Sequence, residues 1–566
     1  MANRNFPAGD WKLVRVQGTD RQRGRQHAEQ VGEAARNGMP FFYARLLSRL
    51  VSEKPAALGD RAVLWAVRKA IDPVLVKTLL RQVPSGARDR ISGFAESAQL
   101  SQRELELALV LPDLLPIVQG AFCRVFPGRF AEVAPAALFG CSSFVSRAGG
   151  FLVGRNLDFP GVGYWDRYPV IQHSKPEGAL QSISFTSAGV PLGGITGVNE
   201  QKIYVAIHQH YGCTTSLGGT LPFIVAEKIL DQARSLDDAL GILERAKFSS
   251  SWAFVLADGK TRNAAICEVT ARERGMRTLQ TRHLSHANFF QTPQCKPREF
   301  ATTMRMNWDN QARAARLDTL VDREADALTA PAAAQILSDH WDPYWDEEKV
   351  VNRTISQAFN IQSVVLDLEN LQGWLGTGPS PIHLGEYKKY DLASIFSGGD
   401  GVTQAAVDGF RFKDPRKQMA KQALVTSLVD AMDGKMASAL HQLEVGLGHQ
   451  YCEEMALTAA IVAMKQGREA WARETLDKAV AQLETRMKEH GKASPPPEYF
   501  EMRLFQGRFA DLKGDRAKAQ EHYAYVAQSK ALQDRNLKRL AKQHKPYGRK
   551  QLDRLMLPYS TYAPFN

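Results

Sequence analysis

The sequence predicts a layered α+β domain followed by an all-α region, in a chain of 566 residues. From residue 141 to about 384, short apolar segments bounded by Gly, Pro and Asn turns are typical of strands, and only two helical patterns interrupt them. Beyond residue 402, apolar residues recur at helical spacing and a short motif repeats. Because the chain is too long for one hydrophobic core, we expect two or three domains.

The first predicted domain, residues 1–140, has a mainly helical pattern. Residues 23–50 and 62–71 carry apolar side chains three and four positions apart, which is the spacing of a helix with one buried face. A segment rich in Pro, Gly and Phe, residues 126–135, then leads to Gly140. This composition is typical of a connector rather than of a helix.

The second predicted domain, residues 141–397, contains most of the strands. Helical patterns are confined to residues 221–232 and 236–246. Two helices within a strand-rich stretch indicate layers of helix and sheet. Strands are expected at residues 142–145, 151–154, 181–185, 203–207 and 251–256.

The third predicted domain, residues 402–566, follows a glycine-rich linker at 397–401. A motif around Gly434 recurs around Gly467 and again around Gly514. The first interval, 33 residues, is typical of tetratricopeptide-like helical hairpins, with an ordinary helical bundle as the alternative. Stacked helices of either kind form a surface for a protein partner or for packing rather than an active site.

The charge of the chain is uneven. The formal net charge is +12, and residues 530–554 hold nine Lys and Arg against two Asp, a net +7. Such a segment is expected either to contact anionic membrane or to form a solvated helix face. No nucleic-acid-binding motif accompanies it, so no specific nucleic acid is expected as a partner.

The composition, 44% hydrophobic and 23% charged, is ordinary for a soluble globular protein. No run of 18 apolar residues is present, and the N-terminus lacks the apolar core of a signal peptide. We therefore expect a cytoplasmic protein, with the periplasm or secretion as alternatives if a leader has been removed.

The six cysteines show no metal-ligand or disulfide spacing, so no metal is expected. Cys141 alone has neighbours that suggest chemistry: Gly140 precedes it, and Arg155 and Asp158 follow within one predicted hairpin. A thiol reacts as a thiolate, so a base must remove its proton, and no papain-like Cys/His pair is present. The α-amino group freed by cutting Gly140–Cys141 would be such a base, with a pKa of about 8 in peptides. The sequence thus predicts a self-cleaving precursor.

These motifs resemble the cysteine-type N-terminal nucleophile (Ntn) hydrolases, and most of all the acyl-coenzyme A:6-aminopenicillanate acyltransferase-like group. Choloylglycine hydrolases and penicillin V acylases are more distant relatives. Residues 15–27 also resemble the opening helix of that group's propeptide. The matching segments, in order, are residues 140–144, 154–159, 194–200 with 205–209, 285–290 and the helix that carries Arg313 and Arg316.

The resemblance implies a four-layer αββα sandwich that needs no cofactor. Cys141 would be the nucleophile and, through its freed amine, the base. Arg155 would stabilise the thiolate, and Asp158 would bind and orient the new α-amino group.

The resemblance also implies an oxyanion hole, in which Asn288 and the backbone N–H of Gln209 would bind the developing negative charge. A further site arginine is expected at Arg313, although Arg316 is equally well placed by spacing.

Aromatic and imidazole side chains near these motifs are candidates for a substrate pocket. Tyr164, Trp165 and Tyr168 follow Asp158 closely, and they are expected either to line an acyl pocket or to pack in the core. His208 and His210 alternate with their neighbours on a predicted strand, so one is expected to face substrate.

The expected reaction is cleavage of a linear, non-peptide amide through a thioester on Cys141. Hydrolysis and acyl transfer use the same residues, so the motifs fit both. Two other classes remain open: an ester or phospholipid hydrolase on the same fold, and an inactive or uncleaved Ntn domain that carries a protein-binding scaffold.

Overall fold

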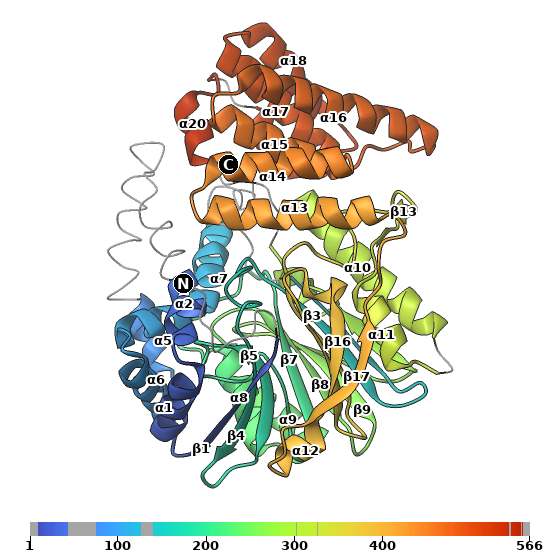
Figure 1. Ribbon diagram of the computed structural model, residues 1–566. Helices are drawn as coiled ribbons and strands as arrows, with labels where there is room; N and C mark the ends of the chain where they lie inside the picture. The colour runs from blue at the N-terminus through green and yellow to red at the C-terminus, as the bar shows by residue number, and fades with distance from the viewer. Residues whose placement is uncertain are drawn as a thin grey trace.

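The computed structural model contains two sheets packed face to face, with a stack of helices over one end (Figure 1). The structure describes residues 10–43, 75–125, 140–300, 303–324, 327–542, 545–555 and 557. The helix expected at 62–71 and the connector expected at 126–135 lie outside these residues.

The two large sheets account for nearly all strands of the described residues. The strands of the first are β1 (Lys12–Gly18), β4 (Pro169–Pro176), β5 (Ser182–Ser187), β6 (Thr196–Asn199), β7 (Ile203–Gln209), β8 (Trp252–Asp258), β9 (Asn263–Val269) and β10 (Arg274–Thr278), in that order. The second has the order β11 (His283–His286), β2 (Gly140–Ser146), β3 (Leu152–Asp158), β14 (Asn360–Asp367), β15 (Gln372–Gly376), β16 (Glu386–Asp391) and β17 (Val402–Asp408). A third, two-stranded sheet pairs β12 (Trp341–Asp342) with β13 (Glu347–Glu348).

Helices cover the outer face of each large sheet. On the first sheet, α8 (Pro222–Gln232) packs on β7 and α9 (Leu236–Arg245) packs on β8. On the second, α10 (Met304–Arg323) packs on β11 and β2, while α11 (Ala330–Leu337) packs on β3 and β14. Buried apolar side chains such as Val145, Ile171 and Val364 fill the space between the sheets. The predicted α+β class and four-layer αββα sandwich are confirmed, as are the five expected strands and both expected helices.

The N-terminal region is less helical than its sequence suggests. Residues 12–18 form β1, which pairs in parallel with β4, because buried Val14 and Val16 alternate with more exposed neighbours. The helix α1 (Asp20–Val31) begins only after Thr19, whose side chain caps it. The opening helix expected over 15–27 therefore begins only at Asp20, and the described part of the helical pattern over 23–50 contains α1 and a second, shorter helix, while residues 44–50 lie outside the described residues. The further described helices here are α2 (Ala34–Asn37), α5 (Lys77–Arg81), α6 (Ser85–Ala98) and α7 (Gln102–Val125).

The boundary between sandwich and helical region also differs from the expected linker at 397–401. A short helix, α12 (Leu392–Phe396), precedes the turn at those residues, and β17 then pairs with β16 as the edge strand of the second sheet. The all-α region therefore starts at Pro415 rather than at residue 402. An exposed edge strand whose apolar residues do not alternate regularly with polar ones gives no clear periodic signal, which explains the error.

The C-terminal helical region, residues 415–555, consists of helical pairs. Within it, α13 packs on α14, α15 on α16, and α17 on α18. Gly434, Gly467 and Gly514 each lie at the turn inside one pair, with φ of 78°, 78° and 87°, a conformation that favours glycine. The repeated motif thus marks the same position in three hairpins. The helices are α13 (Pro415–Met432), α14 (Met436–His449), α15 (Glu453–Lys465), α16 (Glu469–Glu489), α17 (Pro497–Lys513), α18 (Arg516–Gln528), α19 (Arg535–Ala541) and α20 (Arg549–Arg554).

The basic stretch 530–554 contains α19 and α20. One of its cations, Arg549, donates to the backbone carbonyls of Met464 and Lys465 at the end of α15. A positive charge at the C-terminal end of a helix interacts favourably with the helix dipole. Of the helices that the structure describes, none combines the length and the hydropathy needed to cross a membrane.

Candidate active site

Cys141 is the second residue of β2 and is 1% exposed. Its thiol faces the guanidinium of Arg155 on the neighbouring strand β3, with Nη2 3.7 Å from Sγ. The same Nη2 donates to the carbonyl oxygen of Ile207 at 2.7 Å, which fixes the guanidinium beside the thiol. Burial raises the pKa of the Cys141 thiol, and the charge of Arg155 opposes this rise more than any other group.

The backbone of Cys141 is held from two further elements. Its N–H donates to Asn288 Oδ1 at 2.6 Å, and its carbonyl oxygen accepts from Arg313 Nη1 on α10 at 2.8 Å. Arg313 Nη2 also reaches Asn288 Oδ1 at 3.3 Å. The spacing alternative, Arg316, instead pairs with Asp339 at 2.8 Å. Of the two arginines, Arg313 is therefore the one in contact with Cys141.

Both the oxygen and the nitrogen of the Asn288 amide make hydrogen bonds in this arrangement. Its Nδ2 donates to the backbone carbonyl of Gln209 at 2.9 Å, while its own backbone carbonyl accepts from Asn310 at 3.0 Å. The structure therefore fixes both ends of the Asn288 side chain beside the Cys141 nitrogen.

Asp158 ends β3 directly opposite Gly140, the residue before the nucleophile. Asn360 Nδ2 donates to its Oδ1 at 2.9 Å, and no other side chain or backbone group of the described residues donates to Oδ2. Burial raises the pKa of Asp158 to about 7, although the charge of Arg313 opposes this. A buried carboxylate with one oxygen unused is suited to receive a cation.

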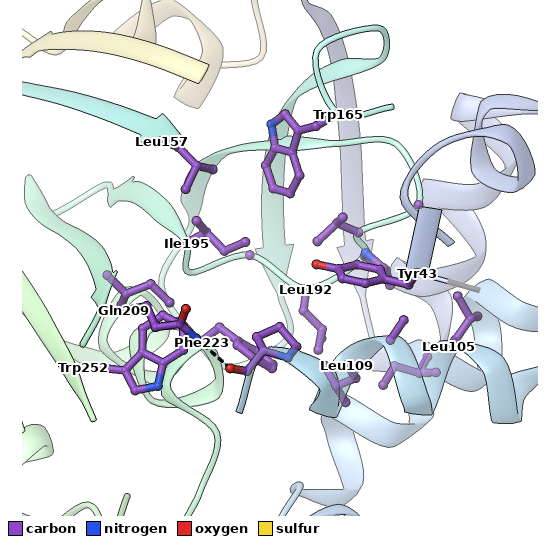
Figure 2. Close-up of a pocket in the computed structure, with 18 of the residues that line it drawn as sticks. Tyr43, Leu105, Leu109, Leu157, Trp165, Leu192, Ile195, Gln209, Phe223 and Trp252 are labelled. Atoms are coloured by element: carbon purple, nitrogen blue, oxygen red, sulfur yellow. Dashed lines mark hydrogen bonds between the residues drawn. The ribbon is translucent and has the colours of Figure 1, made fainter. Parts of the chain in front are cut away.

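An apolar cavity opens beside Cys141 and contains about 830 Å3 of empty space, counting its open mouth. Figure 2 shows that Tyr43, Leu105 and Leu109, all from before residue 140, face Leu157 and Trp165 across it. Both chains that the predicted cleavage would produce therefore contribute to this cavity. The remaining labelled side chains that line it are Leu192, Ile195, Gln209, Phe223 and Trp252.

A missing backbone hydrogen bond within α7 connects the N-terminal region to the cavity. Pro116 lies inside α7 and has no N–H, so the carbonyl of Pro112 has no helical donor. Gln209 Nε2 donates to that carbonyl at 2.9 Å instead (Figure 2). The Gln209 side chain thus joins the cavity wall on β7 to α7, a role that its sequence motif did not indicate.

Of the expected pocket residues, the structure brings Trp165 to the cavity but not the others. Tyr164 donates its hydroxyl to Asp433 at the end of α13, and Tyr168 packs outside the cavity lining. The prediction that His208 and His210 line the substrate pocket is wrong, because neither contributes to the cavity lining. Strand alternation puts them on the face of β7 opposite to Gln209.

The two histidines lie between the sheets. His208 Nε2 is 2.7 Å from Ser143 Oγ, and His210 Nε2 is 2.8 Å from His286 Nε2. Burial holds the pKa of His208 well below its usual range. Among the described residues, no group of three His, Cys, Asp or Glu side chains is placed to hold a metal ion.

Three residues of the site were not predicted from the sequence motifs: Asp309, Asn310 and Asn360. Asp309 pairs with Arg313 at 2.9 Å, one turn along α10. A weak signal existed, because polar side chains recur at helical spacing on the face of α10 that also carries Met306 and Leu317. Asn360 carries no comparable signal, since it meets Asp158 only through the pairing of β14 with β3.

Residues 145–365 match the family model described as acyl-coenzyme A:6-aminopenicillanic acid acyl-transferase. No curated protein matches the chain. Among solved structures, the chain is similar to the Caenorhabditis elegans N-acylethanolamine-hydrolyzing acid amidase (NAAA) ortholog, with 14% identity and a TM-score of 0.30 over 40% of this chain and 93% of that one. The family match begins four residues after Cys141 and includes Arg155, Asp158, Asn288 and Arg313. The family match covers less than half of the chain, and it shows that this central segment is similar to the acyl-coenzyme A:6-aminopenicillanic acid acyl-transferases.

Proposed function

We propose that the protein is a self-processing cysteine amidase or acyltransferase that acts on linear amides with an apolar acyl group. The observation that carries this proposal is the convergence of three side chains on Cys141: Arg155 at its sulfur, Asn288 at its nitrogen and Arg313 at its carbonyl. An apolar cavity adjoins the sulfur. Fixed charges and donors around one buried thiol are the arrangement that nucleophilic catalysis requires.

The first reaction in this proposal cuts the chain itself. Sγ of Cys141 attacks the carbonyl carbon of Gly140, the bond to the Cys141 nitrogen breaks as that nitrogen takes up the proton lost by the thiol, and a thioester forms. Water then hydrolyses the thioester, which leaves the carboxylate of Gly140 and a free amine on Cys141. Asp158, opposite Gly140 and with Oδ2 unused, is the group proposed to bind that amine as it becomes charged.

The second reaction uses the freed amine as the base. It takes the thiol proton, and the thiolate attacks the substrate's amide carbonyl. The amine of the substrate leaves with a proton, and the acyl group remains on Sγ as a thioester. Water or a second amine then removes the acyl group, so hydrolysis and transfer differ only in the last acceptor.

The cavity suggests the acyl side of the substrate. Its lining is mainly aliphatic and aromatic, and burial of apolar surface contributes about 25 cal/mol per Å2. We therefore propose an extended apolar acyl chain along α7, with the amine portion toward solvent. An ester with the same acyl group would fit the same cavity, so the experiment below compares amides with matched esters.

The test is a series of amides and matched esters of increasing acyl length, assayed with the wild type and with Leu109→Trp. Leu109 is half-buried and lines the cavity. A tryptophan there fills part of the cavity, so we expect kcat/KM for the longest acyl chains to fall about 10- to 100-fold while the shortest are unaffected. The acyl group should appear as added mass on the chain that starts at Cys141.

Leu107→Trp is the matched control, because Leu107 lies on the same helix with similar burial but does not line the cavity. It should leave the chain-length preference unchanged. Faster cleavage of esters than of amides at every length would favour the ester-hydrolase alternative. A lack of any acyl mass on Cys141 would contradict the proposed function.

The raised pKa of Asp158 predicts a pH-dependent stability, best measured in uncut protein that carries Cys141→Ala. The unfolded state releases the Asp158 proton near 3.8, whereas the native state keeps it to about 7. The favourable contribution of Asp158 is therefore complete below 3.8 and is lost as pH rises to about 7. The substitution Asp158→Asn introduces a side chain that is neutral at every pH. The double variant should gain stability over Cys141→Ala from pH 4 to 8, by on the order of 2–4 kcal/mol.

Urea unfolding of the two proteins at pH 4.5, 6 and 8 measures this difference. If the difference in free energy of unfolding between the two proteins is the same at all three pH values, Asp158 is not protonated in the native protein. Its proposed role as the carboxyl group that binds the new α-amino cation would then lose this support.

A further inference from the structure

A short loop, residues 352–357, lies between the C-terminal helical region and the active site; we call it the bridging loop. Its first two residues, Asn352 and Arg353, have φ of 81° and 47°. Two successive non-glycine residues in the left-handed region persist only where their surroundings hold them. Arg353 is also 2% exposed, so its charge needs buried partners.

Those partners come from the helical region as well as from the sandwich. Glu498, at the start of α17, accepts from Arg353 Nη1 at 3.0 Å and from Nη2 at 2.8 Å, which makes a bidentate (two-point) salt bridge. Asp342 accepts from Nε of the same guanidinium at 3.1 Å. Glu498 and Asp342 are both fully buried. A two-point pair fixes the direction of a guanidinium as well as its position.

The other hairpins contact the same loop. Lys421 on α13 donates to the carbonyl of Ser356 at 2.6 Å, and Glu454 on α15 accepts from Asn352 Nδ2 at 3.2 Å. With Glu498 on α17, the first helix of each of the three pairs thus contributes one side chain that contacts the bridging loop. In Figure 1, α13 lies directly over the end of the sandwich, with the other helices of the region beyond it.

On its opposite side the bridging loop touches the active site. The backbone N–H of Arg353 donates to Asp309 Oδ1 at 3.0 Å, and Gln357 Nε2 donates to the same oxygen at 3.3 Å. Asp309 Oδ2 accepts from Arg313 Nε at 2.9 Å, and Arg313 in turn donates to the carbonyl oxygen of Cys141. A continuous set of buried contacts therefore joins Glu498 to the nucleophile.

We propose that Glu498 is a positioning residue, and that the C-terminal helical region is thereby a built-in part of the catalytic apparatus. Glu498 holds Arg353, whose backbone holds Asp309, and Asp309 orients Arg313 on the Cys141 carbonyl. This inference rests on the proposed function of Cys141. It assigns the inward face of the helical region to the enzyme itself rather than to a protein partner.

A second path supports the same coupling and ends at Asp158. Ser356 Oγ is hydrogen-bonded to His383 Nε2, and the backbone N–H of His383 donates to Asn360 Oδ1 at 3.1 Å. Asn360 then donates to Asp158. Through Lys421 and Ser356, the helical region thus also reaches the carboxylate opposite Gly140.

The test compares Glu498→Gln with Glu453→Gln in the full-length chain. Glu453 is a matched control, because it is a buried carboxylate on the same interface that pairs with Lys349 at 3.2 Å and Arg486 at 3.3 Å but does not touch the bridging loop. Both variants should lower the melting temperature. Only Glu498→Gln should slow the cut before Cys141 in freshly translated protein, by about 10- to 100-fold.

The mature enzymes give a second readout, since a positioning role lowers kcat while KM for the acyl substrate stays unchanged. If Glu498→Gln does not fold, Glu498→Asp replaces it, because the shorter side chain keeps the charge but loses the two-point geometry. Equal cutting rates in wild type and Glu498 variant would overturn this inference and leave the proposed function intact. Equal slowing in both variants would also overturn it, as general loss of stability would explain the effect. A wild-type precursor that is never cut would overturn both.

Discussion

Replacing Cys141 by alanine should yield a single uncut chain with no measurable turnover. In the proposed mechanism, the Cys141 side chain is the nucleophile of both reactions, and the α-amino nitrogen of Cys141 is the base of the second. The variant lacks the thiol nucleophile, and because its chain is not cut, its α-amino group is never freed. Its loss of activity should therefore exceed that of every other variant considered. Gel electrophoresis and an amidase assay on the same preparation measure both effects.

Cys267→Ala is the matched control for this prediction. Cys267 is another buried thiol, 7% exposed and within the core, and it lies outside the contacts around Cys141. It should be cut and active like the wild type. If Cys141→Ala retained turnover, the nucleophile would have to be a different residue.

Replacing Arg155 by methionine should give the second largest loss. The guanidinium 3.7 Å from Sγ is the strongest influence that lowers the thiol pKa against burial. Without it, the pKa of Cys141 rises further and less thiolate is present at neutral pH. We expect the rates of cutting and of turnover at pH 7 to fall roughly 10- to 1000-fold, the range that one nearby charge provides.

The pH profile distinguishes this cause from simple misfolding. Because the reactive form is the thiolate, activity should rise with pH, and the midpoint of that rise should lie at higher pH in Arg155→Met. The difference from wild type should thus shrink as pH rises. A loss of the same size at every pH would show that Arg155 acts through structure rather than through charge.

Most of the fold was predictable because its elements have strong local patterns. The buried strands of the sandwich and helices α8 and α9 carry unbroken apolar runs or helical spacing, and the resemblance supplied the layer order. The incorrect predictions concern segments whose local sequence pattern is weak or fits both a helix and a strand. The edge strand β17 is mostly exposed, and β1 is a short strand that overlaps the segment where the resemblance implied a helix.

The candidate site was predictable only in part. Residues within recognisable motifs, such as Arg155 and Asn288, meet at Cys141. His208 and His210 were misplaced, because a motif gives neighbours along the chain but not the face of the strand. Asn360, Arg353 and Glu498 could not be predicted, since only the packing of distant elements brings them to the site.

In the proposed mechanism, the function of the chain begins with a cut before Cys141. N-terminal sequencing and intact mass of the freshly purified wild type detect this cut directly. We expect two chains, residues 1–140 and 141–566, with the second beginning Cys-Ser-Ser-Phe-Val. A single chain of 62.8 kDa that stays intact in fully folded protein would contradict it.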